Sequence, residues 1–117
     1  MLASSRVPWH PLPMATVKLA SPHDVNRLRG AVKLIDVREP HEYTGELGHI
    51  PEAELVPLAT VPTAATAWDK NAPIVCICRS GARSGRAAEA LVAQGFADVT
   101  NMTGGMIAWN AEGLPKA

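Results

Sequence analysis

The sequence has few cysteines, no excess of charge of either sign and no long apolar run. Its two cysteines, Cys76 and Cys78, are two residues apart, and the peptide between them strains any disulfide. Free thiols in a reducing, cytoplasmic compartment are therefore predicted. Eleven basic and eleven acidic residues cancel, so the charge indicates neither nucleic acid nor an anionic membrane as partner. No apolar run approaches the roughly 20 residues that span a bilayer.

Length and segmentation predict one domain preceded by a short arm. A chain of 117 residues has room for one hydrophobic core. Residues 1–15 contain three prolines, no periodicity and no continuous apolar stretch of the kind found in signal peptides. We expect residues 1–15 to be a flexible N-terminal arm and residues 16–117 to form the domain.

From Thr16 onward, short apolar runs alternate with amphipathic segments, which is the pattern of a parallel sheet with crossover helices. Strands are predicted at 16–19, 32–37, 54–56, 74–77 and 98–102. Helical segments are predicted at 22–29, 40–43, 60–68, 84–94 and 104–109, the first with Ser21 as its N-cap. The chain is therefore expected to be an α/β layer sandwich, whose functional site lies at the C-terminal ends of the strands.

The most informative segment is CRSGARS, residues 78–84, which directly follows the apolar run at 73–77. Its first residue, Cys78, is a thiol at the C-terminal end of a buried strand, followed by a glycine-containing loop and an alanine-rich helix. Loop N–H groups, the helix N-terminus and the flanking arginines all stabilise a thiolate. Cys78 is therefore predicted to be a nucleophile, whereas Cys76, inside the strand, fits a buried core cysteine.

Four sequence blocks together resemble a known family. They are LIDVREPHEY (34–43), GHIPEA (48–53), CICRSGARSGRAAEAL (76–91) and GGMIAWNAEGLP (104–115). In this order they resemble the single-domain rhodaneses, which are thiosulfate sulfurtransferase-like proteins. The resemblance implies a three-layer α/β domain with a central five-stranded parallel sheet flanked by helices. One position departs from the family pattern: Glu52 stands where the family usually has glycine, which concerns the turn geometry more than the chemistry.

The resemblance also implies a reaction. A sulfurtransferase of this family moves a sulfane sulfur from thiosulfate or another persulfide donor to cyanide or a thiol acceptor. The sulfur is carried as a persulfide on the first residue of the loop, here Cys78. A protein could be the donor or the acceptor, and neither a metal nor an organic cofactor is required. His10, His23 and His41 have no companions at ligand spacing, so a metal site is not expected.

The remaining loop residues are expected to surround the sulfur with hydrogen-bond donors. These residues are Arg79, Ser80, Gly81, Ala82, Arg83 and Ser84. Gly81 is expected to take a positive φ, which brings backbone amides close to the sulfur. The hydroxyls of Ser80 and Ser84 are candidate donors, although Ser84 is interpreted equally well as a helix N-cap.

The arginines are expected to have different roles. Arg79 is the candidate for attracting the anionic sulfonate of the donor, and a solvated surface arginine is the alternative. Arg83 is expected to brace the loop through a salt bridge to Asp36, with substrate contact as its second role. Asp36 and Arg38 are therefore named as supporting residues. His49 is interpreted as structural, and Trp109 as part of the core.

Two other functions remain open. Cysteine-dependent phosphatases and arsenate reductases, some of which share the rhodanese fold, use a Cys-x5-Arg loop that fits a tetrahedral anion. Cys78 and Arg83 instead form Cys-x4-Arg, a tighter ring that fits a single sulfur atom. The second alternative is a rhodanese-like binding or regulatory sulfur-carrier module with little turnover.

Overall fold

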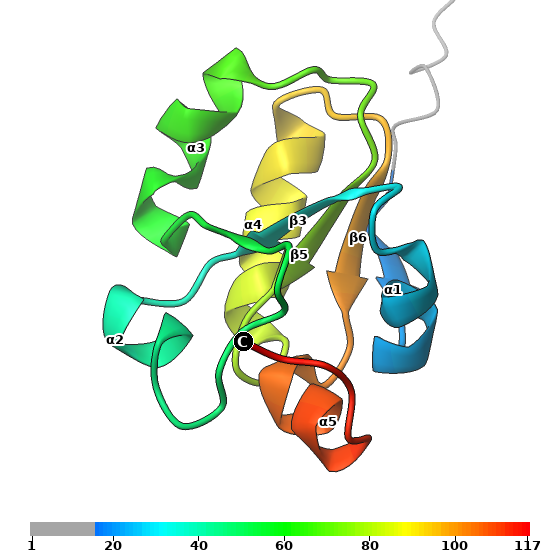
Figure 1. Ribbon diagram of the computed structural model, residues 1–117. Coiled ribbons are helices and arrows are strands. Elements are labelled where there is room, and N and C mark those ends of the chain that lie inside the picture. The colour runs from blue at the N-terminus through cyan, green and yellow to red at the C-terminus, as the bar shows by residue number, and fades with distance from the viewer. Residues whose placement is uncertain (1–15) are drawn as a thin grey trace, which may run out of the picture.

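A computed structural model describes residues 16–117, so the predicted arm at residues 1–15 lies outside the described residues. The described chain forms a five-stranded sheet in the order β2-β6-β5-β3-β4, and all neighbouring strands are parallel. The strands are β2 (Lys18–Ala20), β3 (Lys33–Asp36), β4 (Glu54–Leu55), β5 (Ile74–Ile77) and β6 (Val99–Met102). Helices cover both faces of this sheet, which confirms the predicted three-layer α/β architecture (Figure 1).

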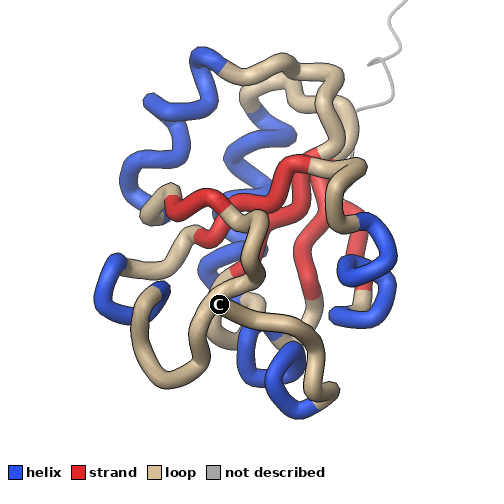
Figure 2. Tube along the Cα trace, viewed as in Figure 1, coloured by secondary structure: helices blue, strands red, loops and turns tan. Residues whose placement is uncertain are grey.

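The helices other than α2 divide between the two faces of the sheet. They are α1 (Pro22–Leu28), α2 (Pro40–Tyr43), α3 (Val61–Ala64), α4 (Ala82–Ala93) and α5 (Gly105–Ala111), with 3₁₀ turns η1 (Leu58–Thr60) and η2 (Ala65–Ala67) on either side of α3. One buried cluster lies between the sheet and α3 and α4, and another between the sheet and α1 and α5. Figure 2 shows the strands enclosed between these two helical layers.

The helix predicted at 60–68 is not one regular helix but a succession of short helical pieces. The hydroxyls of Thr60 and Thr66 each donate to the carbonyl three residues earlier, at 2.7 Å. Such local bonds compete with the regular helical ladder, and Pro62 supplies no N–H to it. The start of α1 is as expected, since the Ser21 hydroxyl accepts a hydrogen bond from the Asp24 N–H at 3.2 Å.

Glu52, the position that departs from the family pattern, has a defined partner. Its carboxylate accepts two hydrogen bonds from the guanidinium of Arg29, at 2.7 and 2.8 Å. Arg29 is the C-cap of α1, so this ion pair joins the end of α1 to the turn before β4. The hydrogen bonds from Arg29 lower the pKa of the Glu52 carboxyl below its ordinary value.

Strand β5 determines where the two thiols point. Its residues alternate between the two buried clusters, as the period of two in a strand requires. Cys76 and Cys78 belong to the same cluster and face α4, whereas Ile77 between them faces α5. Cys76 is fully buried, which confirms its assignment to the core. The neighbouring strands hold β5 in the middle of the sheet, so Cys78 emerges at the centre of its C-terminal edge.

Within residues 16–117, no helix combines the length and apolar character needed to cross a membrane.

Candidate active site

Cys78 lies where β5 ends, and the chain turns around its sulfur before α4 begins. The Gly81 N–H donates to Cys78 Sγ at 3.0 Å, and the Ser84 hydroxyl lies 3.2 Å from the same atom. Gly81 is the N-cap of α4 and has φ +109°, a left-handed conformation that glycine adopts without strain. This confirms the predicted positive φ. Cys78 is only 1% exposed, so the loop encloses the sulfur almost completely.

The loop sets different ionisation for the two thiols. Burial raises the pKa of the Cys78 thiol. Hydrogen bonds from the Ser84 hydroxyl and from the backbone N–H groups of Ser84, Gly81 and Ser80 lower this pKa by more than burial raises it. The net result is a Cys78 pKa below the ordinary thiol value. Burial without such bonds, together with the neighbouring Cys78, raises the pKa of Cys76 to about 12. Cys78 is therefore the thiol that ionises more readily.

The predicted salt bridge between Arg83 and Asp36 is wrong, because each residue has another partner. Arg83 Nη1 and Nη2 donate to the two carboxylate oxygens of Glu42, both at 2.8 Å. Asp36 accepts from Arg38 Nε at 2.9 Å and from Arg38 Nη2 at 2.7 Å, and this pair is buried. Arg38 is two residues from Asp36 along the same strand direction, so its guanidinium reaches that carboxylate first.

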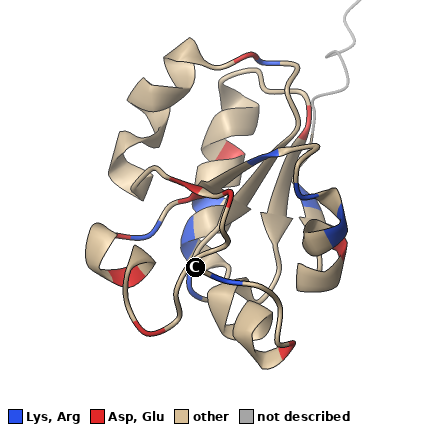
Figure 3. Ribbon diagram, viewed as in Figure 1, with Lys and Arg blue, Asp and Glu red and all other residues tan. Residues whose placement is uncertain are grey.

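Arg83 still braces the loop, but it does so against α2. The bidentate pair with Glu42 joins residues 41 positions apart and connects the start of α4 to α2. Figure 3 shows basic residues at the start of α4 and an acidic residue on α2. Hydrogen bonds from Arg83 lower the pKa of Glu42 to about 2, against the opposing effect of burial.

Arg38 holds together the segments that surround the loop. It is 1% exposed, and besides Asp36 it donates to the backbone carbonyl of Glu42 at 3.2 Å and to that of Gly48 at 2.7 Å. A buried guanidinium needs such partners, since an unpaired one would be costly. Arg38 thus links the end of β3 to α2 and to the chain that follows it.

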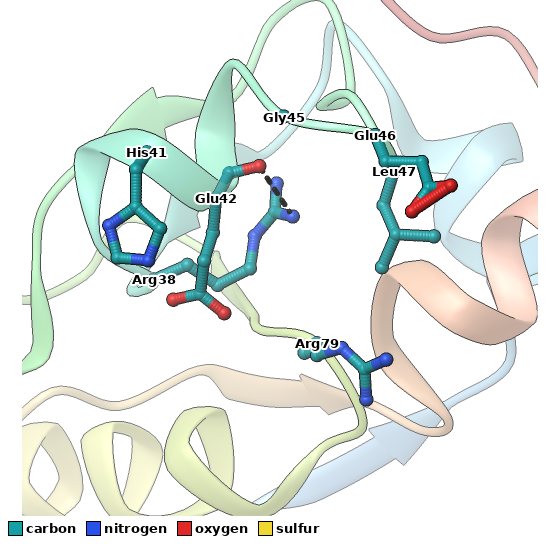
Figure 4. A pocket seen from close by; sticks show the side chains of 7 residues that line it. All are labelled: Arg38, His41, Glu42, Gly45, Glu46, Leu47 and Arg79. Carbon is teal, nitrogen blue, oxygen red and sulfur yellow. Dashed lines mark hydrogen bonds between the residues drawn. The ribbon is translucent and has the colours of Figure 1, made fainter.

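A pocket of about 250 Å³ opens beside the loop (Figure 4). It is lined by Arg38, His41, Glu42, Gly45, Glu46, Leu47 and Arg79. Arg79 borders it from the loop, and the other residues belong to or adjoin α2. The Arg79 side chain has no ion-pair partner within residues 16–117. The pocket therefore offers an uncommitted positive charge on Arg79, the residue that follows Cys78 in the chain.

Two backbone contacts fix the chain beyond the pocket. The His49 N–H donates to the Ala117 carbonyl at 3.1 Å, and the Ala117 N–H donates back to the His49 carbonyl at 2.8 Å. The His49 ring stacks on Tyr43 with centroids 3.7 Å apart, and its Nδ1 lies 2.9 Å from the Tyr43 carbonyl oxygen. These contacts agree with a structural role for His49. Trp109 is fully buried, as expected for the core.

A comparison with known families identifies the family of this fold. The family model described as "Rhodanese-like domain" matches residues 21–112. The chain belongs to the rhodanese-like domain family. A "Sulfurtransferase" of Allochromatium vinosum is 42% identical over 84 residues, covering 72% of this chain and 77% of the relative. A "Thiosulfate sulfurtransferase GlpE" of Pseudoalteromonas translucida is 39% identical over 80 residues, covering 68% and 74% of the two chains.

Solved structures agree with this assignment. The crystal structure of a rhodanese-like domain protein from Staphylococcus aureus superposes with a TM-score of 0.73 at 35% sequence identity. The match covers 86% of this chain and 99% of the other. The predicted family and its five-stranded parallel sheet are therefore confirmed.

The site of this rhodanese-like domain contains two residues that sequence reasoning missed. Glu42 is the partner of Arg83, and Asn101 contacts the loop from β6. The Ser84 Oγ lies 2.6 Å from Asn101 Oδ1, and Asn101 Nδ2 donates to the Gly81 carbonyl at 3.1 Å. The alternation in β6 could have indicated Asn101, because it shares a face with Val99, which packs toward α4.

The structure corrects the position of Ser84 as well. Ser84 is not the N-cap of α4, because Gly81 occupies that position and α4 begins at Ala82. The left-handed Gly81 lets the helix start at once, so Ser84 lies in the first turn. From there its hydroxyl points back to the sulfur. Within residues 16–117 of the rhodanese-like domain, no group of three or more His, Cys, Asp or Glu side chains could hold a metal ion.

The Arg83–Glu42 pair gives the first testable prediction. The pKa of Glu42 is depressed from 4.5 to about 2, so its contribution to stability is complete above about pH 4.5 and is lost as the pH falls toward 2. Glu42→Gln should remove this contribution of Glu42 to the pH dependence of the free energy of unfolding. In a double-mutant cycle with Arg83→Ala, we expect a coupling energy of about 1–2 kcal/mol, measured by chemical denaturation at pH 7.

The exposed Lys18–Asp98 pair supplies a matched control. These side chains are 59% and 40% exposed, so the same cycle there should give less than about 1 kcal/mol. Equal coupling energies in both cycles would show that Arg83 and Glu42 do not brace the loop. So would a free energy of unfolding that falls between pH 4.5 and 2 in Glu42→Gln as it does in the wild type.

Proposed function

We propose that this rhodanese-like domain is a sulfurtransferase that carries a sulfane sulfur as a persulfide on Cys78. The observation that carries the proposal is the cradle of hydrogen bonds around Cys78 Sγ, from the Gly81 N–H and the Ser84 hydroxyl. The cradle favours a thiolate, which is the nucleophilic form of cysteine. The names of the sulfurtransferase relatives support the same chemistry.

The reaction consists of two displacements. The Cys78 thiolate attacks the outer sulfur of thiosulfate, a new S–S bond forms, the bond to the sulfonate sulfur breaks, and sulfite leaves with the electron pair. The negative charge then resides on the outer sulfur of the persulfide. An acceptor, either cyanide or a thiolate, next attacks that outer sulfur and regenerates the Cys78 thiolate. Neither step changes the net charge, and neither needs a further oxidant or reductant.

The loop around Cys78 suits both displacements. Its backbone N–H groups stabilise negative charge on Sγ before the first attack and after the second. Arg79 is exposed at the pocket edge, where it would attract the anionic sulfonate of thiosulfate. We propose that donor and acceptor approach Cys78 from the side of this pocket, whose lining includes the neighbouring Arg79, and either could be presented by a protein. Free thiols of this kind suit a reducing cytoplasmic compartment.

The alternatives have less support. A phosphatase needs its loop arginine free to clamp the transferring phosphoryl group, whereas Arg83 is already held by both oxygens of Glu42. A sulfur-carrier module would load Cys78 in the same way and differ only in its slow release of sulfur to small acceptors. Turnover with cyanide distinguishes a carrier from an enzyme.

Mass spectrometry tests the proposal directly. The protein is incubated with thiosulfate, then with or without cyanide, and digested. We expect the peptide that bears Cys78 to gain one sulfur atom and to lose it on addition of cyanide. Loading that cyanide does not reverse would favour the carrier, and the absence of loading would overturn the proposal.

Arg79→Ala tests the role of the uncommitted arginine. We expect KM for thiosulfate to rise about tenfold with little change in melting temperature, since an exposed cation that attracts the donor contributes uniform binding. The deficit should shrink as the salt concentration rises. Arg86→Ala is the matched control, because Arg86 is an exposed cation on α4 that does not line the pocket. An equal rise in KM in both variants would contradict a specific role for Arg79.

A further inference from the structure

The hydroxyl of Ser84 has more acceptors than it can serve. Its Oγ lies 2.6 Å from Asn101 Oδ1, 3.2 Å from Cys78 Sγ and 3.2 Å from the Gly81 carbonyl oxygen. A serine hydroxyl carries one proton, so it donates to one of these atoms at a time. The shortest of the three distances is the one to Asn101.

The neighbouring backbone fixes the orientation of the Asn101 amide. Its Nδ2 donates to the Gly81 carbonyl at 3.1 Å, so Oδ1 is the atom that faces Ser84. The reversed amide would place two oxygens against each other at Gly81. The Gly81 carbonyl already accepts the first helical bond of α4, from the Gly85 N–H at 3.0 Å. The Ser84 proton is therefore shared chiefly between Asn101 Oδ1 and the sulfur.

We propose that Asn101 is a positioning residue that competes with Cys78 for the single proton of the Ser84 hydroxyl. While Cys78 is a neutral thiol, Ser84 donates to Asn101, and the S–H group can donate to Ser84 Oγ. When the thiolate forms, the hydroxyl turns toward Sγ, and Asn101 Oδ1 loses its donor. Asn101 thus opposes full stabilisation of the thiolate and keeps the sulfur more basic than the cradle alone would make it.

The competition has a role in the sulfur cycle. Sγ carries negative charge before the first displacement, but in the persulfide the charge resides on the outer sulfur. Once Sγ is neutral, the Ser84 hydroxyl can again donate its hydrogen bond to Asn101 Oδ1. The Asn101 amide therefore favours the persulfide over the thiolate. A more basic thiolate is also the better nucleophile. This inference rests on the proposed function of Cys78, but its test needs no sulfur donor.

Other charged or titratable groups near Cys78 do not obscure the test. Arg83 faces it from α4 and is held by Glu42, Arg79 adjoins it in the chain, and Cys76 lies beneath it on β5. Because the pKa of Cys76 is about 12, that thiol stays protonated while Cys78 titrates. None of these groups contacts Asn101 through a hydrogen bond within residues 16–117.

The experiment is a titration of the thiolate ultraviolet absorbance, with Cys78→Ser as the blank. Asn101→Leu removes both polar atoms at similar volume and should increase the thiolate-to-thiol ratio at a fixed pH about fivefold, the effect of one ordinary hydrogen bond. Ser84→Ala should decrease the ratio by a similar factor. In the Ser84→Ala background, Asn101→Leu should have no further effect. A lower thiolate-to-thiol ratio in Asn101→Leu than in the wild type would overturn the proposal. So would an equal effect of Asn101→Leu on this ratio with and without the Ser84 hydroxyl.

Asn101→Asp provides a second, isosteric variant should the leucine variant fail to fold; its second oxygen replaces the amide that donates to the Gly81 carbonyl, a cost that is the same with and without the Ser84 hydroxyl. Its carboxylate is a stronger acceptor for the Ser84 proton, so the thiolate-to-thiol ratio should fall below that of the wild type. That fall must be larger with Ser84 present than in the Ser84→Ala background, where only the added charge acts. Equal falls in the two backgrounds would refute competition for the proton. A protein that fails to load sulfur can still be titrated, so failure of the proposed function and failure of this inference are distinguishable.

Discussion

Cys78→Ser is expected to abolish sulfur loading from thiosulfate, with a loss of about 1,000-fold or more, while the protein stays folded. A serine hydroxyl does not ionise near neutral pH and cannot form a persulfide. The fold should survive because the hydroxyl can take up the hydrogen bonds that Gly81 and Ser84 direct at the sulfur. We expect a stability change of about 1 kcal/mol. Loading is measured by mass spectrometry and stability by thermal denaturation.

Cys76→Ser is the matched control, since Cys76 faces the same layer two residues earlier in the chain. Cys76 is fully buried, and the new hydroxyl would be placed in the apolar interior of the sheet. The Cys76→Ser substitution should lower the free energy of unfolding by about 1–3 kcal/mol and leave sulfur loading intact. If Cys76→Ser stopped loading and Cys78→Ser did not, the assignment of the nucleophile would be reversed.

The features that sequence could predict are those set by neighbours along the chain. The apolar run of β5, the glycine-containing loop that begins at Cys78 and the alanine-rich helix follow one another directly, so their order alone places a thiol at a strand end facing a helix N-terminus. The alternation of apolar and amphipathic segments predicted five strands, and the family resemblance agreed with them. Local pattern also explains why Cys76 and Cys78 could be separated into a core thiol and a loop thiol.

The features that sequence could not predict depend on packing between distant segments. The predicted partner of Arg83 was Asp36, and only the packing of α2 beside the start of α4 shows that Glu42, 41 positions away, is its partner instead. The contact between Ser84 and Asn101 depends in the same way on β6 lying beside β5. Pairings of this kind are decided by which side chains the folded backbone brings within about 3 Å, and charge alone does not rank them.

The second large effect is expected from a glycine that forms no part of the loop itself. Gly105 begins α5 directly behind the loop, where the N–H of Met106 donates to the Cys78 carbonyl at 2.9 Å and that of Ile107 to the Arg79 carbonyl at 3.1 Å. A Cβ on Gly105 would lie 2.4 Å from the carbonyl carbon and oxygen of Arg79 and 2.6 Å from the Cys78 carbonyl oxygen. Backbone atoms cannot move aside as a flexible side chain can, so the loop itself must shift.

Gly105→Ala is therefore expected to destabilise the protein by about 3 kcal/mol or more and to reduce sulfur loading strongly, because the cradle around Cys78 shifts with the loop. Gly113→Ala is the matched control: its φ of +68° is close to the +57° of Gly105, but a Cβ there would meet nothing within 4 Å. The control should cost about 1 kcal/mol from backbone strain alone and leave loading unchanged. Denaturant unfolding and thiosulfate loading are measured on both variants. Since the two glycines share the same conformational strain, the difference between the variants measures the contact of α5 with the loop, and equal effects would mean that this contact does not hold the sulfur cradle in place.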